Sequence, residues 1–376
     1  MIVLYALNLF ALLGLELYRY WFLQKYFRLP LFSPVLIVFI FNFPVFLGTY
    51  YLGPIINGLS FFNPYFQFGI LMLNLQMIIF VILIVILSKY SAIFGRAYHP
   101  FLKYFHIPLT INNVKRFPWV AVFFFILYVT FLTLTAFKHI GILEWVQNPR
   151  LSYLHGRAGV GHYYSISITC LTVSSFFAFL YLNPRWHIFL LPLYLYAFYL
   201  FGSKGIIMRF AGWYLVILAL KISQKQMLIW FPFVLVATMT FSLRHHLGSG
   251  FDISFLIEKF SIILRYFDHM VNGTMYYESF FANRIGLFWG EVWTTSWWGV
   301  LPRSIFSEKP FVYGTINIVE HFYPGAATAG HTPAFGGAVN AFADFGVIGV
   351  ILGALFNPVY FITVLCSALV LSLIHI

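Results

Sequence analysis

The chain has 376 residues and a formal net charge of +12, and 61% of the residues are hydrophobic while only 9% are charged. Soluble domains have about 25% charged residues and need a polar exterior, so this composition excludes a soluble globular protein. We therefore expect an integral membrane protein. On such an apolar chain, basic residues mark cytoplasmic loops and lipid phosphate contacts, and we expect no nucleic-acid binding.

Two features of the apolar runs limit the architecture further. Cys170 and Cys366 each lie inside an apolar run, and no C-x-x-C or regular Cys/His set is present, so neither a disulfide framework nor a zinc site is predicted. The first run ends at residues 17–20 without a small-residue cleavage site, so we expect the first helix to be retained.

Apolar runs of a length suited to membrane helices recur along the chain. They predict an all-α fold, a single polytopic membrane domain over residues 1–376 with about 9–10 transmembrane helices. The last run contains Asn357-Pro358, where we expect a kink or a division into two short helices. The predicted spans are 1–18, 31–52, 66–88, 118–137, 164–182, 186–202, 206–220, 227–243 and 345–372.

Lys and Arg residues follow the first, third, fifth and seventh spans, which places those loops in the cytoplasm and the N-terminus outside. The acidic residues agree, because eight of the ten fall between Asp252 and Asp344 and none falls in a cytoplasmic loop. The predicted outer loops are 53–65, 138–163, 202–205 and 244–344.

The outer loop 244–344 is far longer than an ordinary connection, and its aromatic residues indicate an ordered segment. Between Asp252 and Val271, polar residues recur every three or four positions. This pattern predicts an amphipathic helix that either lies along the bilayer surface or packs on the other spans.

Tryptophans recur at four-residue spacing in the same loop, at Trp289, Trp293 and Trp297, with Trp298 beside them. Indole rings favour the membrane–water interface, so one interpretation is an interfacial belt. The other is a platform on which sugar rings stack, and the sequence leaves both open.

The chain has no P-loop, no H-E-x-x-H and no D-x-D motif, so we expect transfer chemistry that needs neither metal nor cofactor. What it offers instead is a set of outer cations, and several guanidinium groups together can hold a pyrophosphate. The cations assigned to substrate binding or catalysis are Arg150, Arg157, Arg244, Arg284, Arg303 and Lys309.

Lys204 lies in the tight turn 202–205, and Arg209 lies one helical turn into the next span. A charge at the depth of Arg209 either serves the function or reaches the lipid headgroups. A general base is needed to deprotonate a hydroxyl acceptor. His331 is the preferred base, and the other candidates are His155, His162, His245, His246, Glu291 and Asp344.

Three local patterns resemble bacterial O-antigen polymerases, the Wzy-type oligosaccharide repeat-unit polymerases, over residues 120–355. They are the turn Gly202-Ser203-Lys204-Gly205, the stretch 301–310 (LPRSIFSEKP), and the stretch from 331–333 (HTP) to 344–349 (DFGVIG). Some members of the family carry Arg followed by Gly with ten residues between them. Here Arg150 with Gly161 and Arg303 with Gly314 have that spacing.

The resemblance implies a metal-independent glycosyltransferase of the bacterial cytoplasmic membrane that transfers a glycan from undecaprenyl pyrophosphate to another lipid-linked repeat unit. The active site would face the periplasm or cell exterior, between loops 138–163 and 244–344. A chain-length regulator and a flippase are the implied protein partners. Relatives often have further helices after the last span, so we expect this chain to be shorter than they are.

Two alternatives stay open. An O-antigen ligase uses the same donor with a lipid A–core acceptor and also has a large outer loop. A flippase or transporter of lipid-linked oligosaccharide should show related halves, and no internal repeat is evident in the sequence.

Overall fold

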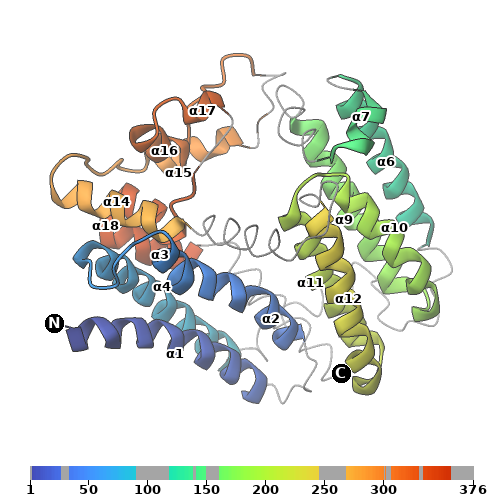
Figure 1. Cartoon of the computed structure of the whole chain (residues 1–376), viewed down its shortest axis with the longest axis horizontal. Helices are drawn as coiled ribbons and strands as arrows, with labels where there is room; N and C mark the ends of the chain where they lie inside the picture. The colour runs from blue at the N-terminus through green and yellow to red at the C-terminus, as the bar shows by residue number, and fades with distance from the viewer. Residues whose placement is uncertain are drawn as a thin grey trace.

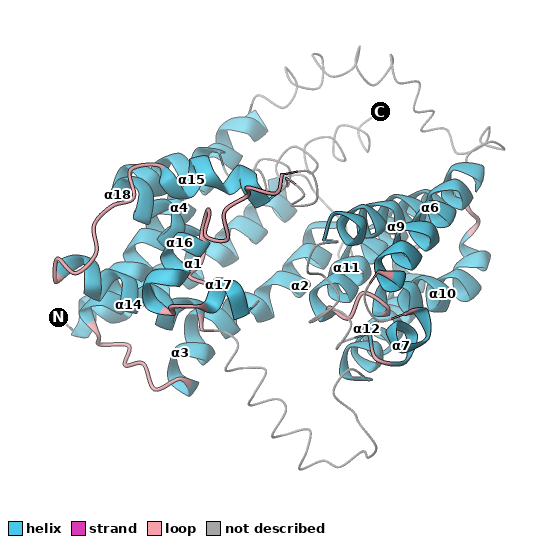
Figure 2. Cartoon of the chain, turned by 90° about the horizontal axis from the view of Figure 1, so that it is seen from above, coloured by secondary structure: helices cyan, strands magenta, loops and turns pink. Residues whose placement is uncertain are grey.

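The computed structural model confirms the all-helical prediction over the part of the chain that it describes. No described residue belongs to a strand, and helices joined by short loops make up both halves of the view in Figure 2. The described residues are 2–26, 34–89, 118–138, 141–149, 161–244, 268–299, 301, 306–329 and 333–356.

The described helices form two groups, which Figure 1 shows side by side, and α2 of the first group packs against α11 of the second. The first group contains α1 (Ile2–Tyr26), α2 (Pro34–Leu47), η1 (Gly48–Leu52), α3 (Gly53–Ile56), α4 (Pro64–Lys89), α14 (His269–Phe281), α15 (Glu291–Thr295), η4 (Ser296–Gly299), α16 (Ile316–Phe322), α17 (Ala326–Ala329) and α18 (Gly337–Phe356). The second group contains α6 (Pro118–Phe137), α7 (Ile142–Gln147), α9 (Gly161–Tyr181), η3 (Pro184–Trp186), α10 (His187–Tyr199), α11 (Lys204–Lys221) and α12 (Gln224–Arg244).

Among the described residues, five helical stretches are long and apolar enough to cross a bilayer, judged by length and composition: Ile2–Phe22, Pro64–Leu83, Trp119–Phe137, His162–Tyr181 and Gly337–Leu355. Large apolar side chains also cover the outside of both groups, which suits a lipid environment. We conclude that the chain is a membrane-embedded helical protein.

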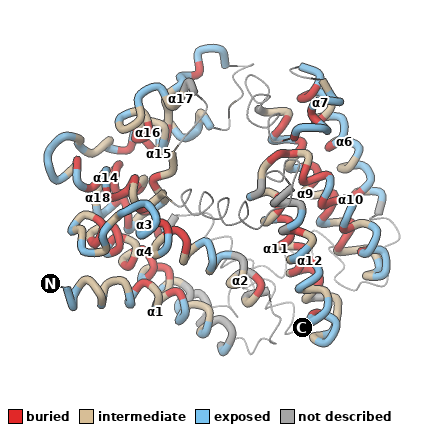
Figure 3. Tube along the Cα trace, viewed as in Figure 1, coloured by how far each residue is buried: buried red, intermediate tan, exposed pale blue. Residues whose placement is uncertain are grey.

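Each group has its own aromatic core, and Figure 3 shows buried positions in the helices of both groups. In the second group, Phe179 packs on Tyr214 with ring centroids 4.5 Å apart, and Phe198 stacks on Phe210 at the same separation. In the first group, Phe68 of α4 contacts Phe342 of α18 at 5.5 Å. The 47 phenylalanines therefore do more than face lipid, because they also fill these cores.

The predicted spans and the helices agree closely for the first eight runs, each of which coincides with helical residues. The predicted amphipathic helix Asp252–Val271 lies largely outside the described residues. Its last residues are described, and there Asp268 is the N-cap residue of α14, which begins at His269. The expected kink at Asn357-Pro358 also lies outside the described residues.

The ninth predicted span begins at a sharp break in α18. Phe345 has φ −134° and ψ 20°, and Gly346 has φ 61°, so the helix divides into two arms there. The arms fold back on each other: a Cβ on Gly349 would lie 1.9 Å from the carbonyl oxygen of Ala341, and one on Gly353 would lie 3.0 Å from the Cβ of Ala341. Residues 337–356 are therefore a helical hairpin, and the apolar stretch Gly337–Leu355 does not run as one straight helix.

Polar side chains between α1 and α4 bond to each other. Asn8 donates to the side-chain oxygen of Gln67 at 2.9 Å, and Asn74 donates to the backbone oxygen of Asn8 at 2.9 Å. Such bonds hold neighbouring helices together in lipid. These side chains therefore contribute to the packing of α1 against α4.

Candidate functional site

The turn that carries Lys204 is fixed by side chains from two other elements. Trp145 of α7 donates its indole N–H to the carbonyl oxygen of Leu200 at 2.8 Å. Tyr164 of α9 donates its hydroxyl to the carbonyl oxygen of Phe201 at 2.7 Å. Both carbonyls come from the end of α10, where a helix has no backbone partners for them. The shorter predicted outer loop, which contains α7, is thereby docked on the turn 202–205.

A buried carboxylate anchors the longer predicted outer loop. Asp344, at the end of the first arm of α18, is 0% exposed. Its Oδ1 accepts the backbone N–H of Val292 at 2.9 Å and that of Gly290 at 3.2 Å, and its Oδ2 accepts that of Trp293 at 2.8 Å. These donors lie at the start of α15, where the N–H groups lack helical partners. Because both oxygens are engaged, the geometry indicates an anchor and not a general base.

The backbone reinforces this anchor. The N–H groups of Phe288 and Trp289 donate to the carbonyl oxygens of Ala343 and Asp344, at 2.8 and 3.0 Å. Those carbonyls lie at the break in α18, where the helical pattern is interrupted. The loop segment 288–293 thus completes the hydrogen bonding of the broken helix, and each stabilises the other.

Lys309 makes contacts within the long predicted outer loop. It is only 9% exposed, its Nζ donates to the carbonyl oxygen of Leu301 at 2.9 Å, and it lies 4.7 Å from the centroid of the Tyr313 ring. Its ammonium group is therefore engaged by residues of the same loop.

Gly314, which ends one of the two Arg-to-Gly spacings, has a steric role. Its φ is +57°, and a Cβ there would lie 2.8 Å from the hydroxyl oxygen of Ser296. Its N–H donates to the Thr295 hydroxyl at 2.7 Å. A glycine is needed at this position because the chain passes so close to the end of α15.

The tryptophans of the long loop divide into different environments. Trp293 packs edge-on against Phe345 with centroids 5.8 Å apart, so it is part of the contact between α15 and the break in α18. Trp289 and Trp297 are 76% and 74% exposed. These two rings are free to contact lipid or sugar, and the two interpretations of the tryptophan series stay open for them.

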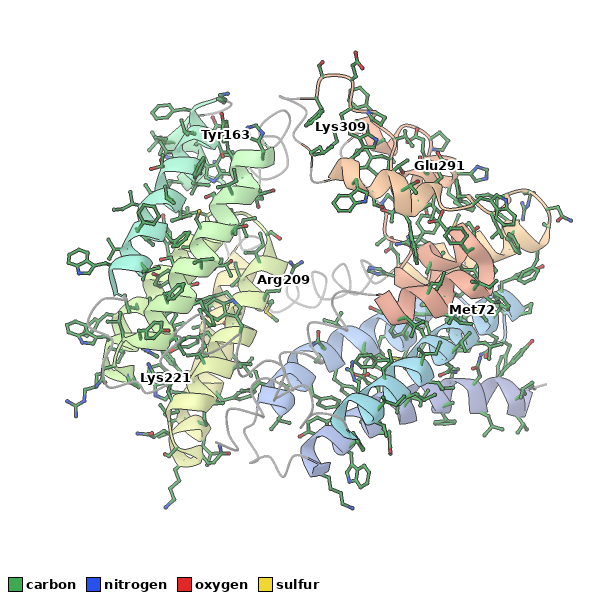
Figure 4. All side chains as sticks on the ribbon, turned by 180° about the vertical axis from the view of Figure 1, so that it is seen from behind. Met72, Tyr163, Arg209, Lys221, Glu291 and Lys309 are labelled. Carbon is green, nitrogen blue, oxygen red and sulfur yellow. The ribbon has the colours of Figure 1, made fainter. Side chains whose placement is uncertain are left out.

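Besides Lys309, two predicted cations are described with their side chains. Arg284 is exposed and forms a 3.4 Å ion pair with the exposed Glu278, an arrangement of little energetic weight. Arg209 is exposed on α11, and Figure 4 shows its side chain extending toward the first helical group. Figure 4 also places Lys309, Glu291 and Tyr163 toward one end of the molecule and Lys221 toward the other.

For two of the remaining predicted site residues the structure describes the backbone alone, and the others lie outside the described residues. Lys204 begins α11 and Arg244 ends α12, but their side chains are not described. Arg150, Arg157, Arg303 and His331, together with the alternative bases His155, His245 and His246, lie outside the described residues. Arg150 directly follows Pro149, which is buried next to α7, so the chain enters this segment from a fixed point.

The other two alternative bases are described. His162 lies at the start of α9 with its ring centroid 4.0 Å from that of Tyr163. Glu291 is exposed and accepts a 3.4 Å hydrogen bond from the Asn317 amide. Neither is close-packed against an acidic or basic partner in the described part of the chain. Within that part, no group of three His, Cys, Asp or Glu residues is placed to hold a metal ion, and Cys170 is a buried free thiol.

At the opposite end of the molecule, Lys221 binds the C-terminus of α9. Its Nζ donates to the carbonyl oxygens of Phe179 and Leu180 at 3.0 Å each and to that of Leu182 at 2.5 Å. A cation at a helix C-terminus completes the unpaired carbonyls and interacts favourably with the helix dipole. Sequence reasoning used this lysine only as a sign of orientation.

Comparison with known proteins adds no family to this description. No protein-family model matches the chain, and neither do the curated proteins or the solved structures.

Proposed function

We propose that the protein is a membrane glycosyltransferase that polymerises undecaprenyl-pyrophosphate-linked oligosaccharide repeat units into a surface polysaccharide. It would act at the outer face of a bacterial cytoplasmic membrane, with donor and acceptor glycans both carried on lipid. A flippase would supply the lipid-linked units, and a chain-length regulator would set the product size.

The charge distribution supports this proposal. Eight of the ten acidic residues lie between Asp252 and Asp344, and basic residues dominate the loops assigned to the cytoplasm. Figure 1 shows α7 and α15–α17 at the same end of the molecule, which is the arrangement expected if both loops protrude from one leaflet.

The observation that carries the proposal is the anchoring of the described part of the long predicted outer loop. Three backbone N–H groups at the start of α15 donate to Asp344, and Lys309 donates to the carbonyl oxygen of Leu301. Transfer from a pyrophosphate requires cations that are held in place before charge develops on the leaving group. A loop anchored to α18 supports that requirement better than a loose loop.

The chemistry asked of the chain is limited, because pyrophosphate is already a good leaving group. The arginines Arg150 and Arg303 would neutralise its charge, Arg209 and Lys204 would contact the lipid phosphate from the second group, and the exposed tryptophans would stack on sugar rings. Positioning of the acceptor hydroxyl against the donor sugar accounts for the rest of the rate increase.

The test is incubation of the purified full-length protein in lipid with a defined undecaprenyl-pyrophosphate repeat unit, followed by separation of the products by size. We expect a ladder of longer glycans from the wild type and none from the Arg150→Ala, Arg303→Ala double variant. The control is Arg185→Ala, which removes an exposed cation of η3.

Other outcomes point to other functions. Transfer of the glycan to a lipid A–core acceptor, without a ladder, would identify a ligase. Movement of the intact lipid-linked unit across the vesicle bilayer, without new glycosidic bonds, would identify a transporter. Unchanged ladders from the double arginine variant would contradict the assigned roles of Arg150 and Arg303.

A further inference from the structure

Two residues next to Gly336 each carry a buried polar atom that has no hydrogen-bond partner among the described residues. These atoms are the Nδ1 of His269, in the first turn of α14, and the Oδ1 of Asn340, in the first turn of α18. A Cβ on Gly336 would lie 3.9 Å from the Cβ of His269, and the N–H of Asn340 donates to the carbonyl oxygen of Gly336 at 3.1 Å. A buried acceptor without a donor is costly, so this corner is suited to a ligand that donates hydrogen bonds.

The frame around the corner is well fixed. Asn272 donates to the carbonyl oxygen of Ala334 at 3.0 Å and accepts a 2.7 Å hydrogen bond from the Tyr323 hydroxyl. Val339 of α18 packs closely on Gly273 of α14. A Cβ added to Gly273 would lie 2.9 Å from the Cγ2 of Val339. The segment 333–336 and α14 therefore keep a constant spacing, as a binding site requires.

The imidazole is in the state that accepts a proton. Burial lowers the pKa of His269 from its ordinary value of 6.5, and the nearby carboxylate of Asp268 opposes this shift. The ring is therefore neutral at pH 7. When its proton lies on Nε2, the unpartnered Nδ1 carries the free lone pair.

We propose that the corner formed by His269, Asn340 and Gly336 binds a sugar of the acceptor glycan, with Nδ1 of His269 accepting a proton from the attacking hydroxyl. Asn340 Oδ1 would accept a hydrogen bond from a neighbouring hydroxyl of the same ring. This assignment rests on the proposed polymerase function and replaces His331 as the preferred base.

In the step itself, the acceptor oxygen forms a bond to the anomeric carbon of the donor, and the bond from that carbon to the pyrophosphate oxygen breaks. The bonding electron pair leaves with undecaprenyl pyrophosphate. The hydroxyl proton passes to Nδ1 of His269 and then to water, which restores the neutral ring.

Kinetics of ladder formation test the role of the imidazole. We expect His269→Gln and His269→Ala to lower kcat by about 100-fold or more, the usual contribution of a general base, with little change in KM. Imidazole added to the medium should restore part of the activity of His269→Ala. Asn340→Ala should mainly raise KM, and His321→Gln, which alters an exposed histidine of α16, should change neither constant.

A second measurement needs no variant. The probe is a repeat unit whose anomeric carbon is joined to the undecaprenyl diphosphate through carbon, so that it acts only as an acceptor. It should protect His269 of the wild type from diethyl pyrocarbonate, measured by mass spectrometry, while His321 stays reactive. Absence of protection, or full activity of His269→Gln, would overturn the assignment to His269. Failure of the wild type to form any ladder would instead overturn the proposed function.

Discussion

Asp344 and Val292 are joined by a 2.9 Å hydrogen bond although 52 residues separate them in the sequence. The bond runs from the N–H of Val292 to a carboxylate that is fully buried at the break in α18. It ties the long loop to the helical hairpin beneath it. The proposed site therefore depends on a contact between α18 and a segment that lies far from it in the sequence.

Replacement of Asp344 by Asn should destabilise this contact. An amide keeps one acceptor oxygen but presents an NH₂ group to a backbone N–H, which leaves a buried donor unpaired at a cost of about 1–3 kcal/mol. We expect a lower midpoint of thermal unfolding in detergent and faster proteolysis within residues 282–336. Glu308→Gln removes an exposed carboxylate of the same loop and should have no such effect.

Gly349→Ala should separate the two arms of α18. The added Cβ would lie 1.9 Å from the carbonyl oxygen of Ala341, a distance that backbone atoms cannot accept without moving. Overpacking of this kind costs about 1–3 kcal/mol. The matched control is Gly286→Ala, where an added Cβ meets no atom within 4 Å. Equal unfolding midpoints for the two variants would show that the hairpin is not closed as described.

Lys221 gives a pH dependence whose sign follows from its environment. Burial lowers the pKa of Lys221 from 10.5 to about 8. Between these values the unfolded chain holds the proton and the folded protein does not, so stability rises with pH across that interval. We expect the unfolding midpoint of the wild type to rise from pH 8 to 10.5 relative to that of Lys221→Met. Lys225→Met, at an exposed position of α12, should follow the wild type.

Much of the fold could be predicted because apolar runs report directly on membrane helices. The boundary expected at residue 345 coincides with the break at Phe345 and Gly346, where Gly346 provides a positive φ. The folding back of α18 on itself could not be predicted, because its cause is the small size of Ala341, Gly349 and Gly353 at one contact. A run of small apolar residues looks the same in a straight helix.

The site was harder to predict because one residue type serves different roles. A carboxylate at the end of an apolar run suggested a base, yet Asp344 is saturated by backbone donors. Lys309 was predicted as a phosphate contact, and nothing in the sequence indicated its contacts with Leu301 and Tyr313. Conversely, the sequence around Trp145 did not predict its role, because its partner Leu200 lies 55 positions farther along the chain.

The central premise is that loops 138–163 and 244–344 protrude from the same, non-cytoplasmic side of the membrane. Single cysteines test it directly when Cys170 and Cys366 are first replaced by Ala. We would introduce Glu144→Cys, Glu308→Cys and Lys225→Cys separately, since all three positions are exposed. A membrane-impermeant maleimide applied to intact cells, with the outer membrane opened where one is present, should label positions 144 and 308 and should reach 225 only after lysis. Labelling of position 308 only after lysis would contradict the account.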